Sequence, residues 1–258
     1  MTKELFIKDV MAQPVTIAKS AKVTEALDKM LDEGIDPLIA THNTSVAGTV
    51  SRQAIARKLG SKQNSSIAPS AIHVSSVVEE DFTSIYPDES IDVLVPLLQR
   101  YKLVVVYDAD HKLIGQVSAG DLLKKVRPDG ALEAAMEEAF TIESDERVVH
   151  LRRRMLDDNI TRFVVTENDK IVGIVTETDV AIAMRKFRKA VTGKHQDHRI
   201  RNLLVKDIMS SPVISIDRRA KVGEIVDLLL KKNISSIPIA ETGKLVGMVT
   251  RQSLVDAL

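Results

Sequence analysis

Two pairs of residues in this sequence place a carboxylate three positions after a hydroxyl: Ser118 with Asp121, and Thr176 with Asp179. Each pair follows a short apolar run typical of a β-strand and precedes a segment with helical character. A strand-to-helix turn of this kind brings a small residue, the hydroxyl, the carboxylate and free backbone N–H groups close together. We expect such a point to suit a phosphorylated sugar, because amides and hydroxyls donate to phosphate oxygens while a carboxylate accepts from ribose hydroxyls.

The same spacing also has a purely structural interpretation. A Ser or Thr before a helix commonly caps its N-terminus, and an Asp in the first turn interacts favourably with the helix dipole. For one isolated pair we would prefer this interpretation. The repetition of the surrounding pattern along the chain favours binding for Asp121 and Asp179.

That pattern, Gly-x-Val followed by Ser or Thr, occurs at 48–51, 115–118, 173–176 and 247–250. In each copy the glycine follows the first apolar residue of an amphipathic stretch by 24 or 25 residues, counted from Val23, Ile91, Val148 and Val222. Such regular spacing indicates one structural unit used four times. The position three residues after the hydroxyl is Ala54, Asp121, Asp179 and Ser253 in turn, so we expect two sites, in the middle copies.

The fourth copy predicts the order of elements within a unit. We expect a strand at 213–216, a helix at 222–230, a strand at 234–240, a turn at 241–244, a strand at 245–250 and a final helix, after a helix-prone lead-in at 205–209. The lead-ins of copies two and three lie near 74–78 and 132–136. The fold class is therefore α/β.

A unit of about 55 residues with three short strands buries too little apolar surface to be stable in isolation, so we expect the units to pair. The breaker-rich junction at 127–130 suggests a boundary near residue 128. We therefore expect one two-repeat module at 1–127, with repeats at about 7–60 and 73–126, and another at 128–258, with repeats at about 132–187 and 205–258.

Composition excludes several classes of protein. Of the 258 residues 44% are hydrophobic, enough for packed cores, and the charges balance at 36 basic and 36 acidic residues, so no global field favours nucleic acid. The absence of cysteine excludes disulfides and thiolate chemistry. Residues 1–11 lack a secretion-signal core, and no apolar run reaches membrane-spanning length, so we expect a cytoplasmic protein.

At this point the chain resembles a known family. Gly-x-Val-Thr-x-x-Asp at 173–179, Ile-Pro-Ile at 237–239 and Gly-Lys-Leu-Val-Gly at 243–247 are similar to motifs of cystathionine-beta-synthase (CBS) domains, which pair into Bateman modules. The resemblance covers nearly all of residues 7–258 and extends to stand-alone archaeal and bacterial CBS proteins and to the gamma subunit of AMP-activated protein kinase. It implies a regulatory protein with adenosine-containing ligands, commonly AMP, ADP, ATP or S-adenosylmethionine, bound between paired repeats.

The resemblance also assigns residues. It implies that ribose is held by Asp121 and Asp179, and that Ser118 and Thr176 contact phosphate or ribose. Thr161 and Arg162 match the place where gamma-type repeats bind phosphate, although Arg162 could equally face water. The candidates for an apolar adenine slot are Ile85, Val105, Ile142 and Val164, each of which could equally be plain core. The proline of the family's central strand is retained only as Pro238, which departs from the pattern in the middle copies.

The sequence supports no catalytic role. It contains no P-loop, His-Glu-x-x-His or Gly-x-Ser-x-Gly motif, and its acidic clusters have no partnered base or nucleophile. We expect no enzyme, no catalytic cofactor and no metal site, but a ligand sensor that signals to an unknown protein partner in trans, as a monomeric disc or a homodimer. The alternatives are an S-adenosylmethionine-type sensor, a nucleic-acid regulator using the basic segment 185–201, and an interaction scaffold.

Overall fold

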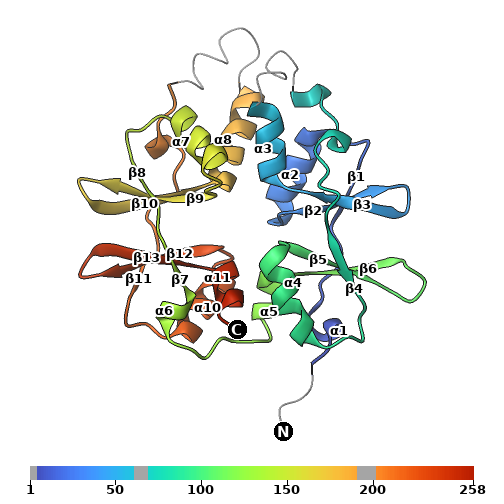
Figure 1. The fold of residues 1–258 in the computed structure, drawn as a ribbon. Helices are drawn as coiled ribbons and strands as arrows, with labels where there is room; N and C mark the ends of the chain where they lie inside the picture. Colours follow the sequence, from blue (N-terminus) through green and yellow to red (C-terminus); the bar gives the residue numbers. More distant parts are fainter. Residues whose placement is uncertain (1–4, 61–68, 191–201) are drawn as a thin grey trace. The chain divides into compact units, whose positions relative to one another are not determined.

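The computed structural model describes residues 5–60, 69–190 and 202–258 (Figure 1). The chain divides into two compact units. Unit 1 comprises Met1–Glu137, Arg219–Ile237 and Val249–Leu258, and unit 2 comprises Glu138–Arg218 and Pro238–Met248. Helices α10 and α11 of the fourth repeat thus belong to unit 1, so the units cut across the boundary expected near residue 128. The division into modules 1–127 and 128–258 stays a prediction.

Four repeats share the order of elements expected from the sequence. The first contains β1 (Thr16–Ala18), α2 (Val23–Glu33), β2 (Leu38–His42), β3 (Ser45–Val50) and α3 (Arg52–Gly60). The second contains β4 (Thr83–Ile85), α4 (Leu94–Arg100), β5 (Leu103–Tyr107), β6 (Leu113–Ser118) and α5 (Ala119–Leu123). The third contains β8 (Thr141–Glu143), α7 (Val148–Asp157), β9 (Arg162–Glu167), β10 (Lys170–Thr176) and α8 (Glu177–Ala190). The fourth contains β11 (Ile216–Asp217), α10 (Val222–Lys231), β12 (Ser236–Glu241), β13 (Lys244–Thr250) and α11 (Arg251–Asp256).

The three-stranded sheets of the first three repeats each combine one parallel and one antiparallel pair. In the first three repeats the initial strand runs parallel to the central strand, which forms an antiparallel hairpin with the third strand. The parallel connection is the helix between the two strands, as a parallel crossover requires. These observations confirm the mixed α/β fold.

The first helix of a repeat packs through one apolar face. In α2 the buried residues Val23, Ala26, Leu27 and Met30 recur at the spacing of one helix face. Helix α10 buries the equivalent positions 222, 225, 226 and 229. The chain turns after α2 at Gly34, whose φ of 67° is the left-handed conformation that commonly ends helices. Local sequence therefore fixes both the face and the end of the helix.

The lead-in of a repeat crosses to the sheet of the neighbouring repeat. The lead-in segments are α1 (Ile7–Val10) and the short helical turns Val74–Ser76 and Val205–Asp207. After them, Ala12 exchanges backbone hydrogen bonds of 2.8 and 3.0 Å with Gln116, Glu79 exchanges bonds of 2.8 and 2.9 Å with Thr49, and Ser210 exchanges bonds of 2.8 and 3.1 Å with Ile174. Helix α6 (Leu132–Ala135) leads into β7 (Met136–Glu137), in the sheet with order β11-β12-β13-β7. This exchange links the first repeat with the second and the third with the fourth.

The crossing explains the glycine of the repeated motif. A Cβ atom built on Gly48 would lie 2.3 Å from the carbonyl oxygen of Glu79, and one built on Gly115 would lie 3.2 Å from that of Ala12. A Cβ on Gly173 would lie 2.6 Å from Sδ of Met209. From the sequence we expected this small residue beside a ligand. The structure gives it a packing reason instead, since only glycine lets the lead-in pass this close.

Candidate functional site

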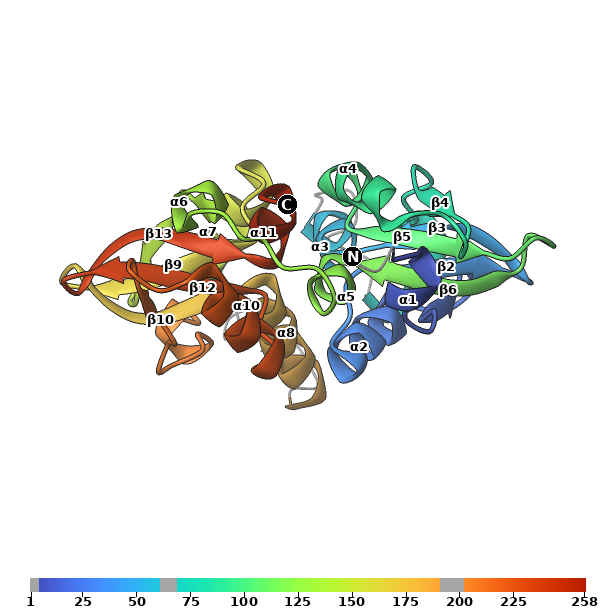
Figure 2. The same cartoon turned by 90° about the horizontal axis from the view of Figure 1, so that it is seen from below.

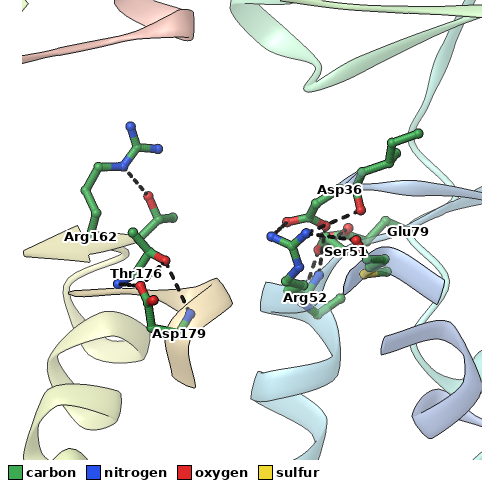
Figure 3. Close-up of polar contacts among 11 residues, drawn as sticks. Asp36, Ser51, Arg52, Glu79, Arg162, Thr176 and Asp179 are labelled. Atoms are coloured by element: carbon green, nitrogen blue, oxygen red, sulfur yellow. Dashed lines mark hydrogen bonds and ion pairs between the residues drawn. The ribbon is translucent and has the colours of Figure 1, made fainter. Parts of the chain in front are cut away.

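Four of the residues assigned from the sequence lie together in unit 2, at the start of β9 and at the turn from β10 into α8; Figure 3 labels Arg162, Thr176 and Asp179 among them. We name this group, Thr161, Arg162, Thr176 and Asp179, the third-repeat corner. Arg162 pairs with Thr176 across β9 and β10, and its Nε donates to Oγ1 of Thr161 at 3.2 Å. All four residues are partly exposed, so a ligand can reach their polar groups.

The carboxylate of Asp179 is held from two sides. Its Oδ2 accepts from the backbone N–H of Thr176 at 2.8 Å and from the Thr176 hydroxyl at 2.6 Å. The backbone N–H of Asp179 lies 3.3 Å from the same hydroxyl oxygen, which completes a helix cap. Its Oδ1 accepts from the hydroxyl of Ser210 at 2.8 Å. Capping thus uses one carboxylate oxygen, and the other contacts the lead-in of the fourth repeat.

Sequence reasoning missed Ser210. The signal that could have found it is its place directly after Asp-Ile-Met at 207–209, a lead-in that matches Asp-Val-Met at 9–11. That match identifies equivalent positions but does not show that the lead-in crosses to the neighbouring repeat. Long-range strand exchange leaves no local periodicity in the sequence.

The second-repeat corner, Ser118 and Asp121, lies in unit 1 and repeats the capping geometry. Oδ2 of Asp121 accepts from the Ser118 backbone N–H at 3.0 Å and from its hydroxyl at 2.6 Å. Oδ1 accepts from Nζ of Lys124 at 2.8 Å. The residue paired with Ser118 is Leu103, in the register that Arg162 occupies in the third repeat. Strand β5 therefore supplies no cation at this position.

The first-repeat corner replaces the missing carboxylate with others. The Ser51 hydroxyl accepts from the backbone N–H of Ala54 at 3.1 Å and donates to Oε2 of Glu79 at 2.9 Å (Figure 3). Oδ1 of Asp36 accepts from the backbone N–H of Arg52 at 3.0 Å. Nη1 of Arg52 lies 3.8 Å from Oδ2 of Asp36, and the two carboxylates outweigh this one cation, which makes the corner unfavourable for a phosphate.

The fourth repeat closes its corner with a second hydroxyl. The backbone N–H of Ser253 donates to Oγ1 of Thr250 at 2.9 Å, and Oγ of Ser253 accepts from the backbone N–H of Thr250 at 2.9 Å. Both side chains are buried. This is a helix cap without a carboxylate to hold ribose.

The four candidates for the adenine slot are all buried and do not form one group. Ile142 packs into the core of the third repeat with Leu151, Phe163 and Val165. Val105 packs with Leu103 and Ile39 of the first repeat. Both environments are those of core residues, the alternative noted from the sequence.

The other two slot candidates differ in position. Val164 lies between Phe163 and Val165, so its side chain points to the sheet face opposite the third-repeat core. Ile85 pairs with Val106 in the parallel part of the second sheet. The adenine slot stays a prediction.

Unit 2 contains a hollow of about 570 Å³ that includes none of the assigned site residues. The lining residues are Glu138, Ala139, Thr141, Glu143, Thr166, Asp169, Lys244, Leu245, Val246 and Gly247. Three carboxylates and one ammonium group line it, which is a poor environment for a phosphate.

Other sequence features fall outside the site. Of the basic segment 185–201, the residues 185–190 continue helix α8, and 191–201 lie outside the described residues. Among the described residues, no three His, Asp or Glu side chains gather in an arrangement that could hold a metal ion. Across the same described ranges, no helix combines the length and the apolar character needed to span a bilayer.

Comparison with known proteins identifies relatives, several of them archaeal. The protein MK0525 of Methanopyrus kandleri is 35% identical over 127 residues, which are 48% of this chain and 60% of that protein. MJ1404 of Methanocaldococcus jannaschii is 23% identical over 98% of this chain and 60% of its own length. The chain therefore spans about 60% of the length of these two relatives. An inosine-5'-monophosphate dehydrogenase of Thermoplasma acidophilum is 24% identical over 64% of this chain and 30% of that enzyme.

Solved structures share the fold. The crystal structure of MJ1225 of Methanocaldococcus jannaschii, described as a proposed archaeal homologue of γ-AMPK, aligns with a TM-score of 0.80 and 19% identity, covering 97% of this chain and 99% of that one. A conserved protein of Pyrococcus horikoshii aligns with a TM-score of 0.64 and 20% identity, covering 97% and 98%.

The model of the CBS-domain family matches four segments of the sequence, 7–61, 74–128, 132–186 and 205–258. Each segment coincides with one of the four observed repeats. The matched segments account for most of the sequence, and the chain belongs to the CBS-domain family.

Proposed function

We propose that this protein binds an adenine nucleotide, AMP, ADP or ATP, at the third-repeat corner and that its occupancy regulates a protein partner in trans. The observation that carries the proposal is the convergence of Thr161, Arg162, Thr176 and Asp179 at one strand-to-helix turn. A further site is proposed at the second-repeat corner. The first and fourth repeats, which lack the carboxylate, are proposed to be empty.

The chemistry of the third-repeat corner suits the two polar parts of a nucleotide. Arg162 offers a planar guanidinium fork, which matches phosphate oxygens better than a lysine ammonium does. Asp179 offers carboxylate oxygens that accept from ribose hydroxyls, and charge-assisted bonds of this type contribute about 1.5–3 kcal/mol each. The two groups are held on adjoining strand and helix ends, so the ligand need not order them.

Regulation follows from the bond between Asp179 and Ser210. Asp179 belongs to the third repeat and Ser210 to the lead-in of the fourth, so a ligand on Oδ1 meets groups from both repeats. A ligand can shift a conformational equilibrium only by binding one arrangement of these groups better than another. A bound ligand would therefore favour one arrangement of the third repeat relative to that lead-in. A protein partner can recognise this arrangement.

Replacing Arg162 by glutamine is expected to weaken AMP binding by about 10-fold to 100-fold, because a charge-assisted bond to phosphate is lost. The affinity for adenosine, which has no phosphate, should change little. Isothermal titration calorimetry of the full chain with adenosine, AMP, ADP, ATP and S-adenosylmethionine measures both effects.

The matched control is Arg153→Gln on helix α7, where the side chain is 82% exposed and pairs with Asp157. It should leave every affinity unchanged. If none of the five ligands binds, the proposed function is refuted. If only S-adenosylmethionine binds, the ligand of the site is this sulfonium compound and not an adenine nucleotide. Nucleic-acid binding that weakens steeply with salt would instead support the basic segment 185–201.

A further inference from the structure

A partly buried arginine of the fourth repeat, Arg251, lies against the second-repeat corner within unit 1. Helix α11 contacts α5, and both helices are labelled in Figure 1 and Figure 2. A Cβ atom built on Gly120 would be 2.9 Å from Nη1 of Arg251. Gly120 is the residue before Asp121, so the guanidinium group stands beside the carboxylate that we assign to ribose.

Only part of this guanidinium group has a structural partner. Nη2 of Arg251 donates to the carbonyl oxygen of Leu229 at 3.1 Å and to Oδ1 of Asn233 at 3.1 Å, which caps the end of α10. Nε of Arg251 is buried and has no hydrogen-bond partner among the described residues. Buried donors in native proteins are almost always satisfied, so an unmatched one calls for a water or a ligand.

The charges at this place favour an anion. Lys124 and Arg251 are both cations near Asp121: Nζ of Lys124 lies 2.8 Å from Oδ1 of Asp121, and Arg251 packs against the preceding residue, Gly120. Burial lowers the pKa of Arg251, and the negative charge of Asp121 opposes this shift. With one carboxylate and two cations the group carries a net positive charge, whereas the first-repeat corner holds the two carboxylates of Asp36 and Glu79 against the one guanidinium of Arg52.

We propose that Arg251 and Lys124 form the anion-binding part of the second-repeat site, so that the phosphate of a nucleotide whose ribose lies on Asp121 is bound by the fourth repeat as well. This inference rests on the proposed function. Nη1 of Arg251 donates to a phosphate oxygen, while Nη2 keeps its bonds to α10.

Lys124 makes room for the sugar when it turns to the phosphate. In the structure the ammonium group of Lys124 donates a hydrogen bond to Oδ1 of Asp121. The Lys124 side chain is 60% exposed, so it can move away at low cost. Once Lys124 has turned, Oδ1 is available to a ribose hydroxyl, while Oδ2 keeps its bonds to Ser118. Binding of a phosphate-bearing ligand therefore ties α11 to α5, and occupancy of the second repeat is transmitted to the fourth.

The test uses the full chain carrying Asp179→Ala, which disables the third-repeat site, and calorimetry with adenosine and AMP. In this background AMP should bind more tightly than adenosine, and adding Arg251→Gln should lower AMP affinity about 10-fold or more while leaving adenosine affinity nearly unchanged. The matched control is Arg52→Gln, because Nη2 of Arg52 caps α2 through the carbonyl oxygen of Met30 in the same way. This control should leave AMP affinity unchanged.

Three results would overturn the inference. AMP affinity could be insensitive to Arg251→Gln, it could fall equally in the Arg52→Gln control, or the Asp179→Ala background could bind neither ligand. Binding of AMP by the unmodified chain tests the proposed function separately, so the two failures are distinguishable. If Arg251→Gln does not fold, Lys124→Ala, at an exposed position, should still lower AMP affinity severalfold, and an unchanged affinity overturns the inference.

Discussion

Replacing Gly48 by alanine is expected to lower the free energy of unfolding by about 3 kcal/mol or more. A methyl group there would lie 2.3 Å from the carbonyl oxygen of Glu79 and 2.8 Å from a methyl group of Val78, so backbone must move. The φ of Gly48 is 141°, a conformation that costs other residues about 1–3 kcal/mol, and overpacking adds about 1–3 kcal/mol. Urea denaturation followed by circular dichroism measures the difference.

Gly223→Ala is the matched control for this substitution. Gly223 lies in helix α10, and a Cβ atom built there meets nothing within 4 Å. Alanine should raise the free energy of unfolding by about 0.5–1 kcal/mol, because it favours the helix over the unfolded chain. Equal stability changes in the two variants would contradict the lead-in crossing as the reason for the repeated glycine.

Replacing Asp179 by alanine is expected to weaken AMP and adenosine binding alike, by about 10-fold to 100-fold. Both ligands carry the ribose whose hydroxyls Asp179 is proposed to accept, whereas Arg162 is proposed to contact only phosphate. Calorimetry of the full chain would show weaker binding at the third-repeat site, with binding at the second-repeat site retained. A loss restricted to AMP would place Asp179 near the phosphate instead.

Asp179→Ala also removes a helix cap, which costs about 1 kcal/mol of stability, so it needs a control with the same structural effect. Ser253→Ala provides one, because Ser253 holds the same position in the fourth repeat and accepts from the Thr250 backbone N–H at 2.9 Å. It should lower the melting temperature comparably and leave ligand binding unchanged. If both variants lose affinity equally, the effect on binding is one of stability, and Asp179 has no direct contact with the ligand.

The glycine of the repeated motif shows what a sequence pattern predicts and what it leaves open. Its fourfold recurrence correctly indicated four copies of one unit, and the family match confirms them. The contact that requires glycine comes from a distant lead-in, because Glu79 lies 31 residues after Gly48 and Ala12 lies 103 residues before Gly115. No property of the motif itself specifies which segment passes over it.

The third-repeat corner shows the opposite case. Thr176 and Asp179 are three residues apart at a helix start, and Arg162 reaches them through the short hairpin of β9 and β10. All three relations are local, so strand and helix geometry alone bring the side chains together. The adenine slot was harder to assign, because a buried apolar residue such as Ile142 or Val164 reveals its sheet face only when its strand is placed on a core.

The sequence by itself determined the elements, their order, the fourfold repetition and the grouping of Thr161, Arg162, Thr176 and Asp179, because turns, caps and hairpins depend on neighbours within a few tens of residues. Only the tertiary structure decided that lead-ins are exchanged between repeats, that Ser210 completes the bonds of Asp179, and that Arg251 lies beside Asp121. These contacts join segments that are distant in the chain. They depend on how amphipathic faces pack, which periodicity permits but does not specify.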